Sequence, residues 1–351
     1  MEGKSNLTSI IILNYNGKNF LKECLDSIIQ ETHSPYEIII VDNDSPDGSG
    51  EFFSKKYPDF KFILNEKNVG VPEGLNIGIR NATGDFIVLL NNDLVVQPNW
   101  LANFFKAYEK TGDALYQPRS LKFRDPGIID GTGCMINIFG FGFARDKGMK
   151  DKGQYSVQEE ISYASGTCMF APKKIFDEIG LFDPTFFAYH EELDIGWRAR
   201  IFGYKSYYVP ETVIHHHGSA HWKWSPQVFY FLERNRWLVL LKNYSIRTLL
   251  KLFPSLIVIE IAMLVFFTSK GLLIKKLQSY GSILRLSDHI RKQRSIIHQN
   301  RKISDEKIMS SFCGTLKIPP EANDSNLNQK FDKLLLILCR LTGYHNIVRE
   351  P

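Results

Sequence analysis

The chain has 351 residues, of which 44% are hydrophobic and 13% aromatic, and a formal net charge of +5. That composition supports a sizeable core, and the mild charge does not indicate a nucleic-acid-binding protein; the length fits one large domain or one domain with an appendage. The five cysteines are odd in number and widely spaced, with no zinc or disulfide pattern, so the sequence favours a reducing compartment.

The first third of the chain alternates predicted strands and helices. Short apolar runs predict strands at 9–13, 36–42, 60–65 and 85–90, and apolar spacing or an early proline predicts helices at 18–30, at 72–81 and from Pro98 onward. Strands that alternate with helices at this spacing predict βαβ units. The expected fold class is therefore α/β, with a mostly parallel sheet flanked by helices.

Three of the predicted strands end in polar residues, at 14–17, 42–47 and 91–93. Asn, Asp and Gly are common in turns, so any one of these ends is explained as a simple turn. In open α/β sheets, however, ligands bind beyond the carboxyl ends of the strands, and three polar ends on one edge favour a ligand site. No GxGxxG motif follows the first strand, which disfavours an ordinary dinucleotide-binding fold.

The segment "YHEELDIGWRAR" (189–200) places Glu191, Glu192 and Asp194 at the start of a predicted helix. The helix dipole alone favours acids in a first turn, which would account for one or two of them. Neighbouring acids on a helix leave the backbone in different directions. One acid can therefore face a cleft while another supports the helix.

The segment "VPETVIHHHGS" (209–219) ends a predicted strand in three consecutive histidines. Such a cluster is explained either as a polar strand end or as a source of metal ligands. Because consecutive strand residues face opposite sides of a sheet, at most two of the three can line one pocket.

The last hundred residues differ in character from the rest. In the apolar segment 249–277, the strongest run covers only residues 252–267, whereas a membrane-spanning helix needs about 20 apolar residues. Basic residues flank the run on both sides and continue through 285–302, so no orientation across a membrane is favoured. We expect a helix at an anionic membrane surface; a spanning helix and a soluble packing helix remain alternatives. A final amphipathic helix is predicted at 331–345.

Several segments together resemble the family-2 glycosyltransferases with the GT-A fold, and most of all their rhamnosyltransferase-like branch. The order and spacing match from about residue 7 to residue 245. The matching segments are "SIIILNYNG", "EIIIVDNDSPDGS", "NEKNVGVPEGLNIGIRNATGDFIVLLNNDLVV", "SGTCMFAPKKIFDEIGLFDPTFFAYHEELDIGWRARIFGY" and "VPETVIHHHGS". The resemblance implies a GT-A catalytic domain over 1–245 and leaves 246–351 as a helical, basic, membrane-associating region.

The resemblance also implies a function. It implies an inverting, divalent-metal-dependent glycosyltransferase that moves a sugar from a UDP- or dTDP-sugar, a rhamnose-type donor included, to a glycan or lipid-linked glycan. The expected location is the cytoplasm, at the inner face of the cell membrane. The alternative is a catalytically silent nucleotide-sugar or glycan-binding protein on the same fold. Asn91 and the Glu191–Glu192 pair favour this alternative, because they depart from the family pattern.

On the donor side, Asp42 matches the family's base-binding aspartate. An ionised carboxylate only accepts hydrogen bonds, which suits the N3–H of uracil or thymine. Asn14 and Asn16 belong to the same edge and are expected to shape this pocket.

The triplet Asn91–Asn92–Asp93 stands where the family carries its DxD motif. Asp93 is the expected ligand of Mg²⁺ or Mn²⁺, hard cations that offset the charge of the diphosphate leaving group. Asn91 lacks the charge of the first aspartate, but its amide oxygen can bind the cation, the ribose or water; Asn92 is assigned to the nucleotide. His216 follows Glu192 by 24 residues, the family's spacing for a metal-binding histidine.

His215 and His217 remain alternatives to His216 as the metal ligand. Glu191 and Glu192 match the family's acid pair, whose second member is the general base, so Glu192 is expected to deprotonate the acceptor hydroxyl. The choice between the two glutamates stays open at this point. Asp194 and Arg198 are expected to give local support, and the loop 165–167 to border the acceptor.

Overall fold

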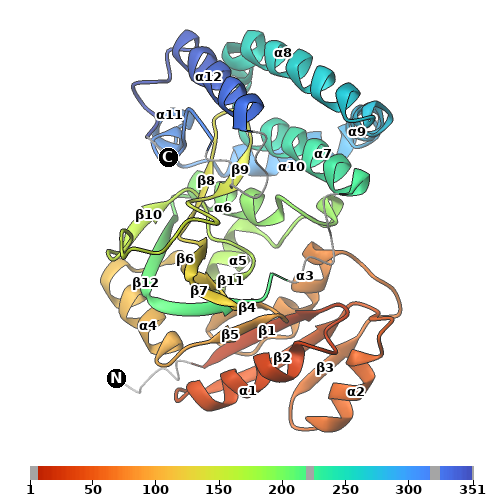
Figure 1. Ribbon diagram of the computed structural model, residues 1–351, viewed down its shortest axis with the longest axis vertical. Helices are drawn as coiled ribbons and strands as arrows, with labels where there is room; N and C mark the ends of the chain where they lie inside the picture. Colours follow the sequence, from red (N-terminus) through yellow and green to blue (C-terminus); the bar gives the residue numbers. More distant parts are fainter. Residues whose placement is uncertain (1–6, 219–224, 317–324, 350–351) are drawn as a thin grey trace.

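The computed structural model describes residues 7–218, 225–316 and 325–349. Figure 1 shows an elongated molecule with the first strands and helices at one end and a group of helices at the other. The rest of the sheet and a small hairpin lie between the two ends. This arrangement places the edge of the sheet near the middle of the molecule.

Within the described residues, ten strands form one mixed sheet with a parallel core. In spatial order they are β10 (Glu159–Ile161), β12 (Lys205–His216), β6 (Ala114–Lys122), β11 (Cys168–Pro172), β4 (Phe86–Asn91), β1 (Thr8–Asn14), β2 (Tyr36–Asp42) and β3 (Lys61–Leu64), while β5 (Leu94–Val96) pairs with β12 and β7 (Asp125–Gly131) with β6. Strands β4, β1, β2 and β3 are parallel, as are β6 and β12; β11 runs antiparallel between the two groups. The predicted α/β class is confirmed.

Helices cover both faces of this sheet. On one face pack α1 (Leu21–Glu31), α2 (Ser49–Lys56) and α4 (Trp100–Thr111), and on the other α3 (Val71–Asn81), α5 (Lys173–Ile179) and α6 (Glu191–Ile201). Ile10 and Ile12 of β1 belong to the first core, and Ile11 to the second, because successive strand residues alternate. A strand buried on both faces needs apolar residues at every position, which explains the continuous apolar runs.

The turn after β4 differs in detail from the sequence prediction. Strand β4 ends at Asn91 and β5 already begins at Leu94, so Asn92 and Asp93 form a tight turn between two strands. The sequence analysis did not predict β5, because its three residues pair with the distant strand β12. In that register Leu94 lies opposite His216. The pairing brings the turn and the histidines together.

The C-terminal region from Pro226 onward is helical, as predicted for 246–351, and it packs onto the rest of the chain. Its helices are α7 (Pro226–Asn243), α8 (Ile246–Ser269), α9 (Leu273–Arg285), α10 (Ser287–Gln299), α11 (Asp305–Met309) and α12 (Ser325–Leu341). The Cys313 amide donates to the Ile136 carbonyl of the hairpin β8 (Cys134–Ile136)–β9 (Gly142–Ala144) at 2.8 Å. Arg294 Nη1 donates to the Tyr244 carbonyl at 2.6 Å. The segment predicted at 249–277 is two helices, α8 and the start of α9.

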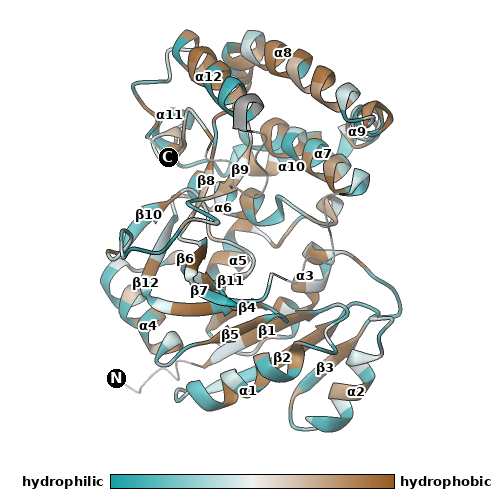
Figure 2. Ribbon diagram, viewed as in Figure 1, coloured by the Kyte–Doolittle hydropathy of each residue, from teal (hydrophilic) through white to brown (hydrophobic). Residues whose placement is uncertain are grey.

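Helices α8 and α9 expose an apolar surface, visible in Figure 2 as hydrophobic ribbon at the helical end of the molecule. Eleven of the nineteen large hydrophobic side chains that are exposed in the described residues lie on these two helices. They are Ile246, Leu250, Phe253, Ile257, Val258, Ile261, Val265, Leu273, Ile274, Leu277 and Leu284. We call this set the α8–α9 face. Its extent exceeds the scattered apolar exposure normal for a soluble surface.

Candidate active site

The end of β2 places Asp42 in a dense set of hydrogen bonds. Its carboxylate accepts from Asn14 Nδ2 at 2.6 Å, from the Ser45 amide at 3.0 Å and from Ser45 Oγ at 2.6 Å, and the side chain is nearly buried. A carboxylate has about four acceptor positions, so these three contacts leave one. The geometry therefore fixes the orientation of Asp42 and still permits one further donor.

Asn14 connects Asp42 to the turn after β4. Its Nδ2 also donates to Ser49 Oγ at 2.9 Å, while its Oδ1 accepts from Asn92 Nδ2 at 2.7 Å. Gly17 lies directly against this contact, since a Cβ there would stand 1.9 Å from Asn14 Oδ1. The structure thus assigns Asn14 and Asn92 to one buried chain of side chains, and places Asn16 beside it through its amide, which donates to Ser45 Oγ at 3.1 Å.

Asp93 and His216 meet at the end of that chain. His216 Nε2 lies 3.2 Å from Asp93 Oδ1, and the His217 amide donates to the Asp93 carbonyl at 2.9 Å. On its other side, His216 Nδ1 lies 2.7 Å from Asp130 Oδ2. Although burial opposes it, the hydrogen bonds to Asp130 and Asp93 raise the pKa of His216 to about 9.

The structure separates the three histidines that the sequence analysis left as alternatives. His216 faces Asp93. His217 stacks on Phe123, with ring centroids 3.8 Å apart, and its Nε2 lies 3.0 Å from Glu23 Oε2. His215 lies opposite Val95 in the pairing of β12 with β5. Of the three, His216 therefore has the geometry of a metal ligand together with Asp93.

The Asp93–His216 pair fits a divalent cation as a partial ligand set. Two neighbouring ligands of an octahedral Mg²⁺ at 2.0–2.1 Å stand about 3.0 Å apart, close to the 3.2 Å between Nε2 and Oδ1. Among the described residues no group of three or more His, Cys, Asp or Glu side chains forms a complete site. That is expected of Mg²⁺, which takes one or two carboxylates and completes its shell with substrate phosphates and water.

Glu192 lies beside the loop 165–167. A Cβ on Gly166 would stand 3.7 Å from Glu192 Cβ, so the loop and the side chain are in contact range. The Asn91 amide donates to the Thr167 carbonyl at 3.0 Å, which joins this loop to the end of β4. The loop 165–167 therefore lies between Glu192 and the end of β4.

Burial governs the protonation of the acid pair. It raises the pKa of Glu192, and it raises that of Glu191 still further because the charge of Glu192 adds to the effect. Each of the two side chains also buries an Oε2 atom that has no hydrogen-bond partner among the described residues, so little offsets a negative charge there. Glu191 thus holds a proton more tightly, which leaves Glu192 as the carboxylate that ionises first and fits the role of base.

The backbone that leads into the acid pair is strained. Phe187, Tyr189 and His190 all have positive φ, at 61°, 68° and 66°. Each such residue costs on the order of 1–3 kcal/mol unless its surroundings hold it there. A conformation of this kind, directly before Glu191, requires support from other elements.

Helix α7 supplies that support. Asn235 is fully buried, and its Nδ2 donates to the carbonyls of Ala188 at 2.8 Å and Tyr189 at 2.7 Å. Arg234 Nη2 donates to the carbonyls of Thr185 at 2.7 Å and Phe186 at 2.6 Å. Arg234 and Asn235 therefore clamp the short 3₁₀ helix η1 (Pro184–Phe186) and the strained residues behind it.

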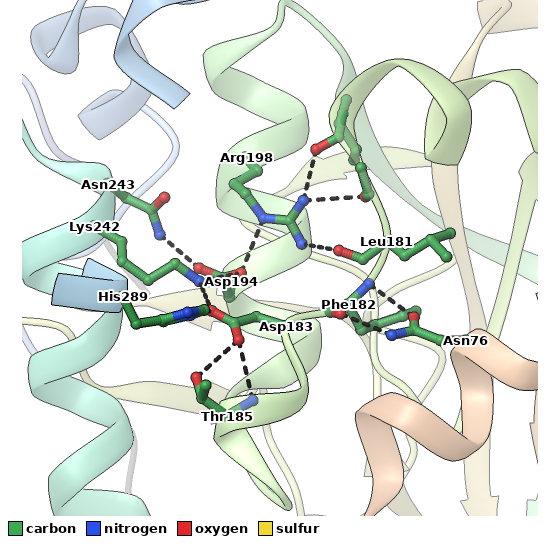
Figure 3. A network of polar contacts seen from close by, with 12 residues as sticks. Asn76, Leu181, Phe182, Asp183, Thr185, Asp194, Arg198, Lys242, Asn243 and His289 are labelled. Atoms are coloured by element: carbon green, nitrogen blue, oxygen red, sulfur yellow. Dashed lines mark hydrogen bonds and ion pairs between the residues drawn. The ribbon is translucent and has the colours of Figure 1, made fainter. Parts of the chain in front are cut away.

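A buried ion network, drawn in Figure 3, fixes the first turn of α6 to α7 and α10. Asp194 accepts from Arg198 Nε at 2.9 Å and from Lys242 Nζ at 3.1 Å. Lys242 also donates to Asp183 at 2.6 Å, and His289 of α10 lies 2.9 Å from the same carboxylate. The expected local contact of Asp194 with Arg198 is present, as part of a larger network.

A cavity of about 60 Å³ lies between β6, β7, β11 and β12, beside Asp130 and the loop 165–167. Its polar lining residues are Gln117, Ser120, Asp130, Lys147, Ser165 and Thr167. Typical ligand pockets measure about 300–1,000 Å³, so this cavity can accept a substituent and not a whole hexose. Asp130 was missed by the sequence analysis; the signal was "GIID" (127–130), an apolar run that ends in an aspartate as "IIIVD" (38–42) does.

The fold defines the class of protein. The mixed α/β sheet with polar carboxyl ends is a GT-A-like fold, the fold of nucleotide-sugar transferases. The crystal structure of GalNAc-T7 with UDP, GalNAc and Mn²⁺ matches it with a TM-score of 0.55, over 68% of this chain and 48% of that chain, at 19% identity. At this identity the match shows the fold alone.

The family follows from the sequence. The pattern of "Glycosyl transferase family 2" matches residues 9–180, so this part of the chain is a domain of that family. It is therefore a glycosyltransferase.

Two curated relatives illustrate the range of the family. A poly-beta-1,6-N-acetyl-D-glucosamine synthase of Staphylococcus epidermidis is 26% identical over 210 residues, 58% of this chain and 48% of that protein. The low-salt glycan biosynthesis hexosyltransferase Agl10 of Haloferax volcanii is 25% identical over 198 residues, 55% of this chain and 61% of that protein. The chain spans about half to three-fifths of their lengths, and neither name points to the rhamnosyltransferase branch.

Proposed function

We propose that this glycosyltransferase moves a sugar from a UDP- or dTDP-sugar to a glycan or lipid-linked glycan, with inversion and with Mg²⁺ or Mn²⁺ at the diphosphate. The observation that carries the proposal is the continuous polar edge from Asp42 through Asn14 and Asn92 to Asp93 and His216. Glu192 stands at the other side of this edge, next to Gly166.

Each part of the edge suits one part of a nucleotide-sugar. Asp42 retains one acceptor position for the N3–H of a uracil or thymine. Asp93 and His216 would hold the cation, which supplies positive charge to the departing diphosphate. The GalNAc-T7 structure contains UDP and Mn²⁺, which supports the same pair of groups on this fold. A rhamnose-type donor rests only on sequence resemblance.

The acid pair supports a single displacement. The acceptor hydroxyl oxygen forms the new bond to the anomeric carbon while the bond from that carbon to the diphosphate oxygen breaks. The hydroxyl proton passes to Glu192, and the electron pair leaves with the diphosphate. Attack from the face opposite the leaving group inverts the configuration. Glu191, with the more strongly raised pKa, keeps its own proton.

We also propose that the α8–α9 face rests on the inner leaflet of the cell membrane. In the described residues, α8 is the one helix long and apolar enough to cross a membrane by length and composition, and 22% of its apolar window is buried. Glu260, in the middle of α8, accepts from Lys276 Nζ at 2.6 Å and pairs with Arg236, both of them buried. A span would have to break this network, so a helix lying in the interface fits better.

Charge supports the same orientation. Exposed basic residues surround the α8–α9 face, namely Arg247, Lys251, Lys270 and Arg285. Each basic residue near an anionic leaflet contributes about 1 kcal/mol. A lipid-linked acceptor would then lie at the same surface as the enzyme.

Calorimetric titration of UDP and dTDP, with and without Mn²⁺, tests the donor site. Asp42→Ala should weaken nucleotide binding with or without metal, whereas Asp93→Ala should remove only the metal-dependent part. Asp59→Ala, an exposed aspartate in a distant turn, is the control. Equal affinity of all three variants and the wild type would contradict the assignment.

A panel of UDP- and dTDP-sugars, incubated with glycan and lipid-linked acceptors, tests the reaction. NMR of the product gives the anomeric configuration. Retention would contradict the single displacement. Donor binding without transfer or hydrolysis across the panel would favour the silent binding protein.

A further inference from the structure

Asp130 stands directly behind His216, at the end of strand β7. Its Oδ2 lies 2.7 Å from His216 Nδ1 and accepts from Ser120 Oγ at 3.2 Å, while its Oδ1 lies 2.8 Å from Lys147 Nζ. The side chain is 8% exposed. Asp130 is thus a buried carboxylate with a hydroxyl and an ammonium partner, and its contact with the imidazole is the shortest of these distances.

The imidazole of His216 lies between two carboxylates with different partners. Nδ1 faces Asp130 and Nε2 faces Asp93. A neutral imidazole donates from one ring nitrogen and accepts at the other. Because ionised carboxylates can only accept, a doubly protonated His216 donates to Asp130 from Nδ1 and to Asp93 from Nε2. A cation bound between Nε2 and Asp93 would take the place of the Nε2 proton, and the proton of the neutral ring would then be on Nδ1, facing Asp130.

The backbone of His216 is held in place, so only the orientation of its ring can vary. Strand β12 is paired there on both sides, His216 lying opposite Leu94 of β5 and Lys122 of β6. The His217 amide is bound to the Asp93 carbonyl. The position of the Cα atom is therefore fixed by the sheet, and what decides which nitrogen meets the cation is the contact at Nδ1.

We propose that Asp130 is a positioning residue that holds His216 in the Nδ1-protonated form and so presents Nε2 to a divalent cation beside Asp93. The inference rests on the proposed function, because it concerns the cation of that site. Asp130 acts through the imidazole: its own oxygens contact His216, Ser120 and Lys147. Loss of such an outer partner of a metal-binding histidine typically costs 10–100-fold in metal affinity.

Mn²⁺ binding, followed by electron paramagnetic resonance of the free ion in the presence of UDP, tests the proposal on the full chain. Asp130→Asn should weaken Mn²⁺ binding 10–100-fold. Asp125→Asn, an exposed aspartate on the same strand, should leave it unchanged. Circular dichroism and the Tm of each variant exclude misfolding, and Asp130→Glu, which restores a carboxylate, provides a second variant if Asp130→Asn is unstable.

A double-mutant cycle separates positioning from a general effect of charge. In a His216→Ala background, Asp130→Asn should cause no further loss of Mn²⁺ affinity, since the group through which Asp130 acts is gone. An equal loss in both backgrounds would overturn the proposal, as would unchanged affinity in Asp130→Asn. Failure of the wild-type protein to bind Mn²⁺ with UDP would instead overturn the metal part of the proposed function and, with it, this inference.

Discussion

Asn235 of α7 donates a hydrogen bond of 2.7 Å to the carbonyl of Tyr189, two residues before the acid pair. Tyr189 has a φ of 68°, a conformation that a non-glycine residue keeps only when it is held. The contact therefore links the placement of Glu191 and Glu192 to a buried amide on a different helix. It gives Asn235 a measurable effect on catalysis without contact with substrate.

We expect Asn235→Ala to lower kcat about 10–100-fold while the KM for the donor stays close to the wild-type value. The loss of its bonds frees the loop, and a misplacement of about 1 Å can cost 10²-fold in rate. Steady-state kinetics with both substrates measures the change. Asn235→Asp keeps the size but removes the donors, so it should be impaired as well.

Asn76→Ala is the matched control for that prediction. Asn76 is also a buried asparagine bonded to backbone, since its Nδ2 donates to the Phe182 carbonyl at 2.8 Å, as Figure 3 shows. It should lose stability by a similar amount without the loss in kcat. If both variants fell equally in kcat, Asn235 would be a general packing residue.

The sequence allowed the sheet to be predicted because strands buried on both faces need unbroken apolar runs, such as residues 38–41 of β2. Among the three consecutive histidines, it favoured His216 only through the family's spacing from Glu192, because the geometry that separates them depends on register. His216 lies opposite Leu94, and no local pattern encodes that distant pairing. For Asp130, the pattern "GIID" marks only a strand that ends in an aspartate; the contact with His216 arises because β7 folds back on β6, which pairs with β12.

The C-terminal region shows a second limit of sequence patterns. The basic residues of 285–302 were expected to continue a membrane-facing surface. Arg294 instead donates to the Leu241 and Tyr244 carbonyls, and Arg301 Nη1 to Asp305 at 2.8 Å. Charge alone does not say whether an arginine faces solvent or caps a neighbouring helix. The apolar surface of α8, whose run of exposed residues follows helical periodicity, is a more direct signal.

Glu192→Gln should retain donor affinity and lose transfer rate by about 10²–10⁴-fold, the usual contribution of a general base. The amide keeps the shape of the side chain but cannot accept the proton. Single-turnover rates with saturating substrates, alongside calorimetric donor affinity, give the two quantities. Glu191→Gln should lose less, because a glutamine resembles the protonated, neutral form of Glu191. A larger loss for Glu191→Gln would exchange the two roles.

The pH profile of the transfer rate should have an acidic limb whose pKa lies above the ordinary pKa of a glutamate. Burial raises the pKa of Glu192 from 4.5, and the base works only when ionised, so the rate should rise with pH through that raised pKa. The nearby Cys134 does not interfere, because burial raises its pKa to about 12. Glu191→Leu removes the neighbouring carboxyl group, whose polar influence lowers the pKa of Glu192, and should move the limb to higher pH. A limb that stays in place would contradict the pairing of the two carboxyls.

The same pKa predicts a trend in stability. The folded state binds a proton at Glu192 more tightly than the unfolded state, so the free energy of unfolding should fall as pH rises from about 4.5 to the raised pKa. Each pKa unit corresponds to about 1.4 kcal/mol. Glu192→Gln should therefore be more stable than the wild type at neutral pH and lose that advantage below pH 4.5. Urea unfolding at several pH values measures the difference; a gain that is constant with pH would contradict the burial argument.

Replacing exposed apolar residues of α8 with acidic residues should release the protein from membranes. Leu250 and Ile261 lie on the α8–α9 face and are 69% and 58% exposed, so glutamate at both positions should leave the fold intact. Removing two apolar contacts and adding two negative charges should abolish flotation with vesicles that contain anionic lipids. Phe52→Glu, at an exposed aromatic residue of α2 far from this face, is the control and should float with the vesicles as the wild type does.

High salt should release only part of the wild-type protein, because the apolar contribution does not depend on ionic strength. Wild-type protein that stays free of anionic vesicles at low salt would show that the α8–α9 face serves another partner.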